Sequence, residues 1–339
     1  MTSKSLRVTR DLEPDLWREF LHDNPQAGIF HTPEMFTVFA RTSGYKPGLW
    51  AVLDAGGCPV ALFTPVRIAL MSGPMGLLTS RAVAYGGVAC RCGREEQAAL
   101  NLLLEAYDRE RSGSVLFTEL RNAAPAGCLQ STLDANGYRH EDHLNFYIDL
   151  TQPETALWGN IRSNARRNVR KAETMGVTVD EITKPDGLGS VYDVLRAVYK
   201  RLQVPLPDAS LFISAFQTLY PLDMMRVLVA RMDNVSIGVL TLLIHQGVMT
   251  YWYTGTLREF STFRPADLLV WRALKLGADS GCRMFDFGGG GRPDEEYGVR
   301  DFKAKFGGKL VNYGRNTCVH APRRLSFSRR GYQLVRQFL

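Results

Sequence analysis

The order of predicted elements restricts the fold of this chain most strongly, because one order occurs in both halves. In the second half, turn residues separate β-rich segments that lead into an apolar helix and a closing strand. These segments are 226–232, 237–245, 248–254, the helix 266–279 and the strand 283–287. The first half has a matching series: 49–53, 59–70, 81–89, the helix 95–111 and the strand 114–120. We therefore predict a duplicated α/β (α+β) fold, each half a mixed, mostly antiparallel sheet flanked by helices. The alternative is two unrelated α+β domains.

The predicted domain boundary lies close to the middle of the chain. A chain of 339 residues exceeds the roughly 250–300 residues that one core supports. The strand 145–150 is followed by Thr151-Gln152-Pro153, which interrupts regular structure. We expect an N-terminal domain at 1–150, a second domain at 151–320 and a basic C-terminal helix at 321–339.

Composition is that of an ordinary globular protein, and we expect it to be cytoplasmic. The longest apolar stretch, 237–244, is much shorter than the roughly 20 residues of a membrane span. Residues 1–17 lack the apolar core of a signal peptide. The six cysteines form no C-x-x-C pair, so reduced thiols are expected and no metal site is predicted.

Positive charge is concentrated on one predicted helix, 158–175. The chain carries a net charge of +7, which favours anionic partners. Five cations spread over half of the helical wheel, opposite an apolar side. They are Arg162, Arg166, Arg167, Arg170 and Lys171. The two readings are a binding face for a polyanion and a solvated surface. The basic tail is compatible with contact to nucleic acid or to a membrane surface, but a terminal helix packed on the body is the preferred interpretation.

Several motifs, in order, resemble the Fem peptidyltransferase family and its GNAT-like acyltransferase relatives. The segment 166–179 (RRNVRKA, then GVTV) resembles the family's helix-to-strand entry. The other matching segments are 28–47, 251–255 (YWYTG), 285–289 (FDFGG) and 301–308 (DFKAKFGG). Together they cover residues 28–313.

The resemblance implies two GNAT-like domains and the formation of an amide bond. An aminoacyl-tRNA ester, or in relatives an acyl thioester, gives its acyl group to an amine, which in cell-wall members belongs to a peptidoglycan precursor. Lys303 matches the family's functional lysine, Tyr251 and Tyr253 match aromatic positions of the acceptor cleft, and Arg201 loosely matches an arginine that contacts acceptor phosphates. Cell-wall members carry a phosphate-contacting lysine on the first-domain helix, where this chain has only Arg41. This departure from the family pattern argues against a sugar-nucleotide acceptor.

Attack of an amine on an ester requires a stabilised oxyanion and a proton acceptor. A lysine ammonium beside the developing oxyanion meets the first need, so Lys303 is the expected group, with Lys305 as the alternative. The candidate bases follow the glycine run: Asp294, Glu295, Glu296 and Asp301.

The predicted donor is aminoacyl-tRNA, and no bound cofactor is expected. Acetyl-CoA enzymes of this fold hold the pyrophosphate with a glycine-rich loop before a helix. The corresponding segment here, 257–268, contains no glycine, and Arg258 and Arg264 would add to the basic helix. The run Gly288–Gly291 lacks the third glycine of a dinucleotide fingerprint. The alternatives are an acyl-CoA or acyl-carrier donor, and a non-catalytic RNA- or polyanion-binding protein. The sequence leaves the oligomeric state open.

Overall fold

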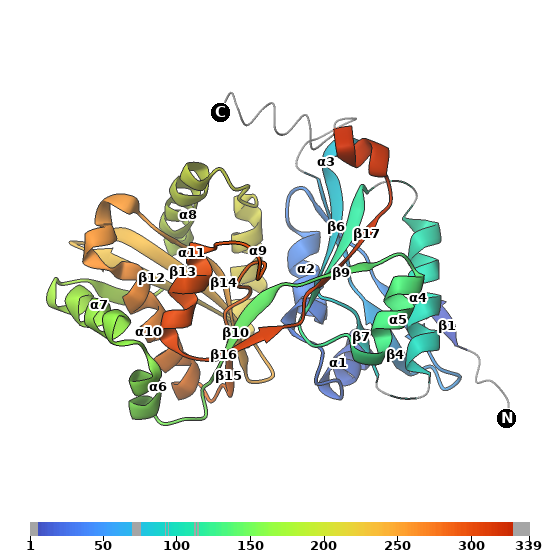
Figure 1. Cartoon of the computed structure of the whole chain (residues 1–339), viewed down its shortest axis with the longest axis horizontal. Coiled ribbons are helices and arrows are strands. Elements are labelled where there is room, and N and C mark those ends of the chain that lie inside the picture. The colour runs from blue at the N-terminus through green and yellow to red at the C-terminus, as the bar shows by residue number, and fades with distance from the viewer. Residues whose placement is uncertain are drawn as a thin grey trace. The chain divides into compact units, whose positions relative to one another are not determined.

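The computed structural model describes residues 6–69, 76–91, 93, 95–111, 113 and 115–327. The chain divides into two compact units (Figure 1). One unit comprises Met1–Asp142 and Tyr313–Leu339, and the other comprises His143–Asn312. No helix in the described part of the chain is long and apolar enough to cross a membrane.

The second unit is built on one seven-stranded sheet in the order β11-β12-β13-β14-β15-β10-β16. Its strands are β10 (Leu144–Asp149), β11 (Thr178–Glu181), β12 (Met225–Met232), β13 (Val235–His245), β14 (Val248–Thr256), β15 (Met284–Asp286) and β16 (Lys309–Asn312). Only the β14–β15 pair is parallel. A parallel pair needs a crossover connection, and α10 (Pro265–Asp279) supplies it.

Helices cover both faces of this sheet (Figure 1). Gly238 of β13 lies against Leu269 of α10, whereas Gly255 of β14 lies against Val198 of α8. Gly255 is paired with Val239, the residue after Gly238 on β13. Because successive residues along a strand face opposite sides of the sheet, α10 and α8 lie on opposite faces. The helices of the unit are α6 (Glu154–Asn160), α7 (Ser163–Thr174), α8 (Leu188–Leu202), α9 (Ala209–Leu219), α10 and α11 (Gly298–Lys303).

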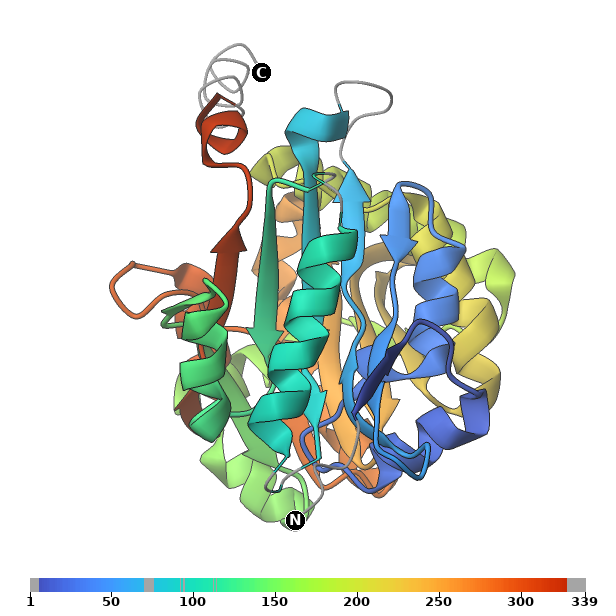
Figure 2. The ribbon, with the colours of Figure 1, turned by 90° about the vertical axis from the view of Figure 1, so that its right-hand side faces the viewer.

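The first unit repeats the crossover of the second. Its two sheets have the orders β1-β3-β4-β7 and β2-β5-β6-β8-β17-β9, and β6 pairs with β8 in parallel. Helix α4 (Glu96–Glu110) connects these two strands, as α10 connects β14 and β15, and Figure 2 shows it lying over the strands, roughly along their direction. The predicted duplication of the α/β fold is therefore confirmed.

The first unit contains further short strands and helices around this crossover. Its strands are β1 (Arg7–Thr9), β2 (Tyr45–Pro47), β3 (Trp50–Leu53), β4 (Pro59–Phe63), β5 (Val66–Ala69), β6 (Ser80–Gly86), β7 (Ala89–Cys90), β8 (Phe117–Asn122), β9 (Arg139–Glu141) and β17 (Arg315–Val319). Its other helices are α1 (Pro14–His22), α2 (Pro33–Ala40), α3 (Gly76–Thr79) and α5 (Gln130–Ala135).

Two strands belong to a different unit from the one expected. β10, predicted to end the domain 1–150, pairs with β15 and β16 of the second unit. The residues of β17 fall within the predicted second domain, 151–320, but this strand pairs with β8 and β9 of the first unit. The chain thus passes between units at 142–143 and again at 312–313. Strand pairing is non-local, so the turn at Thr151–Pro153 did not reveal which sheet each strand joins.

The predicted helix 158–175 is two helices, α6 and α7, separated at Ile161 and Arg162. Both residues adopt extended backbone conformations there, at the C-cap of α6 and the N-cap of α7. Of the predicted tail helix 321–339, residues 322–327 are helical, and 328–339 lie outside the described residues.

Candidate functional site

The strands β14 and β15 part at their carboxyl ends, and this opening is the candidate site. Their pairing runs from Val248 and Met284 to Thr250 and Asp286. Beyond that level β14 carries a bulge between Tyr251 and Tyr253, and the chain after β15 enters the glycine run Gly288–Gly291. In open α/β sheets ligands bind at such carboxyl ends, and bulges re-aim side chains there.

Glycine is required in the run 288–291 because the backbone there lies very close to β14. Gly288 has φ +72°, and a Cβ atom there would lie 2.8 Å from the carbonyl oxygen of Tyr251. A residue with a side chain would be strained and would collide with backbone. The run therefore brings backbone groups next to the end of β14.

Lys303 lies at this opening and is only 5% exposed. Its Nζ donates to the carbonyl oxygens of Phe287 at 2.6 Å and Gly289 at 2.7 Å. Nζ also lies 5.1 Å from the centroid of the Tyr251 ring. An ammonium group has three N–H donors, so two of them hold the glycine run in place. Burial lowers the pKa of Lys303 to about 8, against a smaller opposing effect of Asp286.

Asp286, at the end of β15, is a functional candidate that sequence reasoning did not single out. Its Oδ1 accepts hydrogen bonds from Asn145 Nδ2 at 2.6 Å and from the Gly288 N–H at 2.7 Å. Burial raises the pKa of Asp286, while these donors and Lys303 lower it. The available signal was one carboxylate in the otherwise apolar segment 284–287, directly before the glycines.

Asn145 of β10 completes this network. Its Oδ1 accepts from the Gly289 N–H at 2.9 Å, while its Nδ2 donates to Asp286. Asn145, Asp286 and Lys303 thus hold both sides of the glycine run through side chains from three elements. A half-buried acid and a buried base whose pKa values are both perturbed are typical of functional sites.

The acids predicted as proton acceptors lie in solvent. Asp294, Glu295 and Glu296 are exposed in the loop after the glycine run, and Asp301 is exposed on α11. Arg292 Nε lies 3.3 Å from Asp294 and 3.8 Å from Glu295. The structure therefore places Asp286, and none of these four, in the network around Lys303. Residues two apart on a helix point about 200° away from each other around its axis, so Asp301 on α11 faces outward where Lys303 faces inward.

The two predicted tyrosines extend along β14 from the opening. Tyr251 packs against Phe287, with ring centroids 5.7 Å apart, and burial raises the pKa of its phenol. Tyr253 packs edge-on against Phe212 of α9 at 5.0 Å and lies 6.1 Å from Tyr199 of α8. Both tyrosines are half-buried, so each leaves part of its surface to solvent or ligand. Arg201 is exposed in the last turn of α8, and the structure records no contact that ties it to this network.

The five cations of the basic helix have different surroundings. Arg166 Nη1 donates to the carbonyl oxygens of Gly159 at 2.8 Å and Ile161 at 2.9 Å, so it satisfies the C-terminal end of α6. Arg170 lies 5.5 Å from the ring centroid of Trp158. Arg170 is exposed, as are Arg162, Arg167 and Lys171. The predicted apolar side is confirmed for Ala165, Val169 and Ala172, which are fully buried.

A carboxylate occupies the N-terminal turn of α10. Asp267 is 6% exposed and accepts a hydrogen bond from Asn168 Nδ2 of α7 at 3.2 Å. Burial raises its pKa, whereas Asn168, Lys305 and Arg264 lower it. The structure therefore brings the predicted residues Lys305 and Arg264 to the start of α10, together with α7. Arg264 is the N-cap of α10, in the left-handed region at φ +59°.

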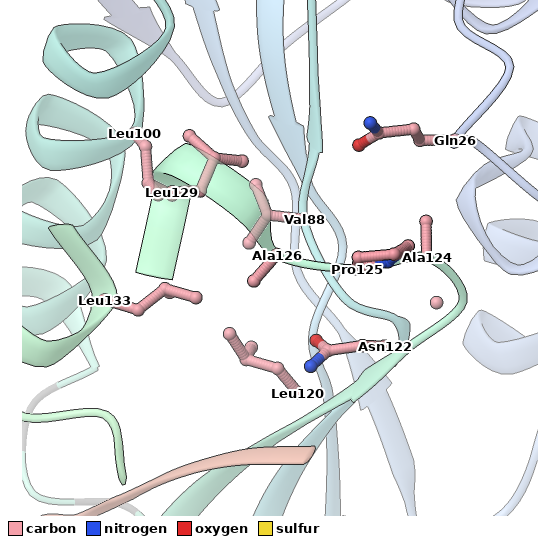
Figure 3. Close-up of a pocket in the computed structure, with 11 residues that line it drawn as sticks. Gln26, Val88, Leu100, Leu120, Asn122, Ala124, Pro125, Ala126, Leu129 and Leu133 are labelled. Carbon is pink, nitrogen blue, oxygen red and sulfur yellow. The ribbon is translucent and has the colours of Figure 1, made fainter. Parts of the chain in front are cut away.

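The equivalent position of the first unit is closed. Where β6 and β8 end beside α4, a cavity of only about 30 Å³ remains (Figure 3). Its lining includes the amides of Gln26 and Asn122 and is otherwise apolar, with no charged side chain. The Asn122 amide is already bonded to the Tyr313 carbonyl at 3.0 Å and to Asn316 at 2.8 Å. The charged network therefore distinguishes the second unit. Within the described residues, no group of three or more His, Cys, Asp or Glu is arranged to hold a metal ion.

Comparison with known proteins supports this organisation. Residues 159–303 match the family model of the acetyltransferase (GNAT) domain. The fold is similar to that of FemX, with a TM-score of 0.71 and 13% identity over 95% of this chain and 99% of that one. No curated sequence matches.

Two further solved structures share the fold over most of both chains. A tandem GNAT protein from the clavulanic acid biosynthesis pathway has a TM-score of 0.60 and 13% identity, covering 93% of this chain and 98% of its own. L-PGS from Bacillus licheniformis has a TM-score of 0.57 and 14% identity, covering 94% and 96%. The resemblance to the Fem family is thus confirmed at the level of the fold, and two GNAT-like units are present. Acyl transfer is the general chemistry that these matches support.

Proposed function

Starting from this two-unit GNAT fold, we propose that the chain transfers an aminoacyl group from aminoacyl-tRNA to an amine acceptor. The observation that carries the proposal is the Asp286–Lys303 network around the glycine run, at the carboxyl ends of the parallel strands. The positive charge of Lys303 held at that point would stabilise the oxyanion formed when an amine attacks an ester carbonyl.

The start of α10 favours tRNA over an acyl-CoA donor. A pyrophosphate binds a helix N-terminus because free N–H groups and the helix dipole attract negative charge. Here the Asp267 carboxylate already lies in that turn, buried and bonded to Asn168. A diphosphate would meet a buried acid, at a loop without glycine. An acyl-CoA or carrier thioester therefore remains the second candidate, and the GNAT family match is what favours it.

The face formed by Arg162, Arg167 and Lys171 supports binding of a larger polyanion. These three side chains are exposed on α7 and on the residue that precedes it. Glu173, the nearest acid on the helix, lies 3.6 Å from Arg272 instead. Mutual repulsion among these cations would be relieved by the phosphates of an acceptor stem.

The donor can be tested by direct transfer. Purified protein is incubated with a small amine or peptide acceptor and with either a pool of radiolabelled aminoacyl-tRNA or a panel of acyl-CoAs. We expect label to leave tRNA for the acceptor in an alkali-stable bond, with no consumption of thioester. Thioester consumption without tRNA would support the second candidate. Activity with neither donor, together with tight tRNA binding that is unaffected by Lys303→Ala, would indicate a non-catalytic polyanion-binding protein.

The salt dependence of tRNA binding tests the proposed face. Each phosphate contact contributes about −0.7 to −0.9 to the slope of log affinity against log salt. Arg167→Gln and Lys171→Gln should each reduce the magnitude of that slope by about 1. Arg166→Gln should leave the slope near the wild-type value, because its guanidinium is bonded to backbone carbonyls. Lys184→Gln, an exposed cation of the same unit, is the matched control. Equal slopes for all four variants and wild type would contradict the assignment.

A further inference from the structure

A second cavity lies in the first unit, at the opposite end of the β6–α4–β8 crossover from the closed one. It has a volume of about 230 Å³ and is bounded by the bend between β2 and β3, by β5 and by the last turn of α4. Trp50 and Tyr107 form apolar parts of its wall and are 6% and 3% exposed. Its size is below the 300–1,000 Å³ of sites for drug-sized ligands, so a small ligand would fit.

The lining carries an excess of positive charge. Four cations, Arg10, Lys46, Arg67 and Arg111, line the cavity with one acid, Glu110. Arg10 is paired with Glu110, and Arg111 Nη2 lies 2.6 Å from Asp108, which is outside the lining. These two cations are therefore neutralised.

The other two, Lys46 and Arg67, face each other without an acidic partner. They are directly opposite in the β2–β5 register, where like charges destabilise a sheet. Arg67 Nε donates to the neutral hydroxyl of Ser80 at 3.1 Å, and among the described residues neither cation forms an ion pair. The residues outside the described ranges contain no Asp or Glu.

We propose that this cavity binds a small phosphorylated ligand, with the phosphoryl group held between Lys46 and Arg67. A phosphoryl group carries about −1.5 to −2 charges at neutral pH, which matches two unneutralised cations. The guanidinium fork fits phosphate oxygens in pairs, and a lysine adds a point charge. A ligand there would replace a repulsive cross-strand pair with two attractive contacts.

The test uses inorganic phosphate, the simplest probe of this chemistry, on the full chain. Thermal unfolding is followed while phosphate is titrated at constant ionic strength, with chloride as the replaced anion. We expect the wild-type midpoint to rise with phosphate concentration, as it does for any ligand that binds only the folded state. Arg67→Gln should weaken the apparent affinity by about tenfold or more, the effect of losing one charge-assisted hydrogen bond.

The controls separate a binding site from a structural role. Without phosphate, Lys46→Gln should be as stable as wild type or more stable, because it removes a like-charge pair, and with phosphate it should lose most of the shift. Arg109 is an exposed cation on α4, the helix that borders the cavity. The Arg109→Gln variant should keep the full phosphate-dependent rise of the unfolding midpoint. Equal stabilisation of wild type by chloride and phosphate, or equal loss in Arg109→Gln and Lys46→Gln, would overturn the proposal. Tighter binding of succinate than of phosphate would overturn the phosphoryl assignment.

Discussion

Replacing Lys303 by methionine should lower the rate of acyl transfer by about 10²–10³-fold, the loss seen when one preorganised oxyanion donor is removed. Methionine is apolar and of similar length, so it fills the space without the charge. The carbonyl oxygens of Phe287 and Gly289 would lose their donors, and the glycine run would no longer be fixed at the end of β14. Steady-state rates measured with saturating donor should therefore fall more than donor affinity does.

The pH dependence of wild type identifies the protonation state that acts. In the folded protein the pKa of Lys303 is about 8, below the ordinary lysine value of 10.5, so the ammonium is present below about pH 8 and lost above it. If the ammonium is the active form, the transfer rate falls as pH rises through about 8, and Lys303→Met lacks this descending limb. A wild-type rate that instead rises through pH 8 would indicate a neutral lysine acting as base and would contradict the oxyanion role.

Stability gives a second, independent measurement on the same variant. Between about pH 8 and 10.5 the unfolded state binds the Lys303 proton more tightly than the folded state does. The contribution of this group to the free energy of unfolding therefore rises with pH across that window. Urea unfolding of wild type relative to Lys303→Met should show this rise. Lys309→Met, an exposed lysine on β16, is the matched control and should follow wild type in both rate and stability.

The repeated element order was readable from sequence because strands, turns and crossover helices are encoded locally. The apolar runs 237–245 and 266–279 and the turn at Gln246-Gly247 each specify their own structure. The pairing of β10 and β17 was not readable, because hydrogen-bonding partners more than a hundred residues away decide which sheet a strand joins.

The candidate site was predicted in part for a related reason. Lys303 was identified through a motif. Its ammonium group, however, donates to backbone carbonyl oxygens at the glycine run, and no sequence pattern encodes such contacts. Arg166 and Arg167 are adjacent and chemically identical in sequence, yet one satisfies the end of α6 and the other is exposed. Whether a cation serves the fold or a ligand depends on the helix break at Ile161 and Arg162. The cross-strand pair of Lys46 and Arg67 likewise exists only once β2 and β5 are in register.

Replacing Asp286 by asparagine should reduce transfer by roughly 10–100-fold while leaving the fold in place, about 1.4–2.7 kcal/mol of transition-state free energy. Asparagine keeps an oxygen that can accept from Asn145 Nδ2 and from the Gly288 N–H, so the hydrogen bonds at 2.6 and 2.7 Å need not be lost. Only the negative charge disappears. Asp286 is thus predicted to act by positioning the glycine run and by its field on Lys303.

The electrostatic effect of Asp286 on Lys303 also predicts the direction in which the pH–rate profile shifts, and a merely structural role for Asp286 would produce no such shift. Asp286 raises the pKa of Lys303, against the larger lowering caused by burial. Removing the charge should therefore lower this pKa further, and the descending limb of the pH–rate profile should move from about 8 to a lower pH. Asp294→Asn and Asp301→Asn change exposed carboxylates near the same lysine in sequence, and their profiles should keep the wild-type limb. If either exposed variant abolished transfer while Asp286→Asn retained the wild-type rate and limb, the proton acceptor would be that exposed carboxylate, in the loop after the glycines or on α11, and the Asp286–Lys303 network would only support the fold.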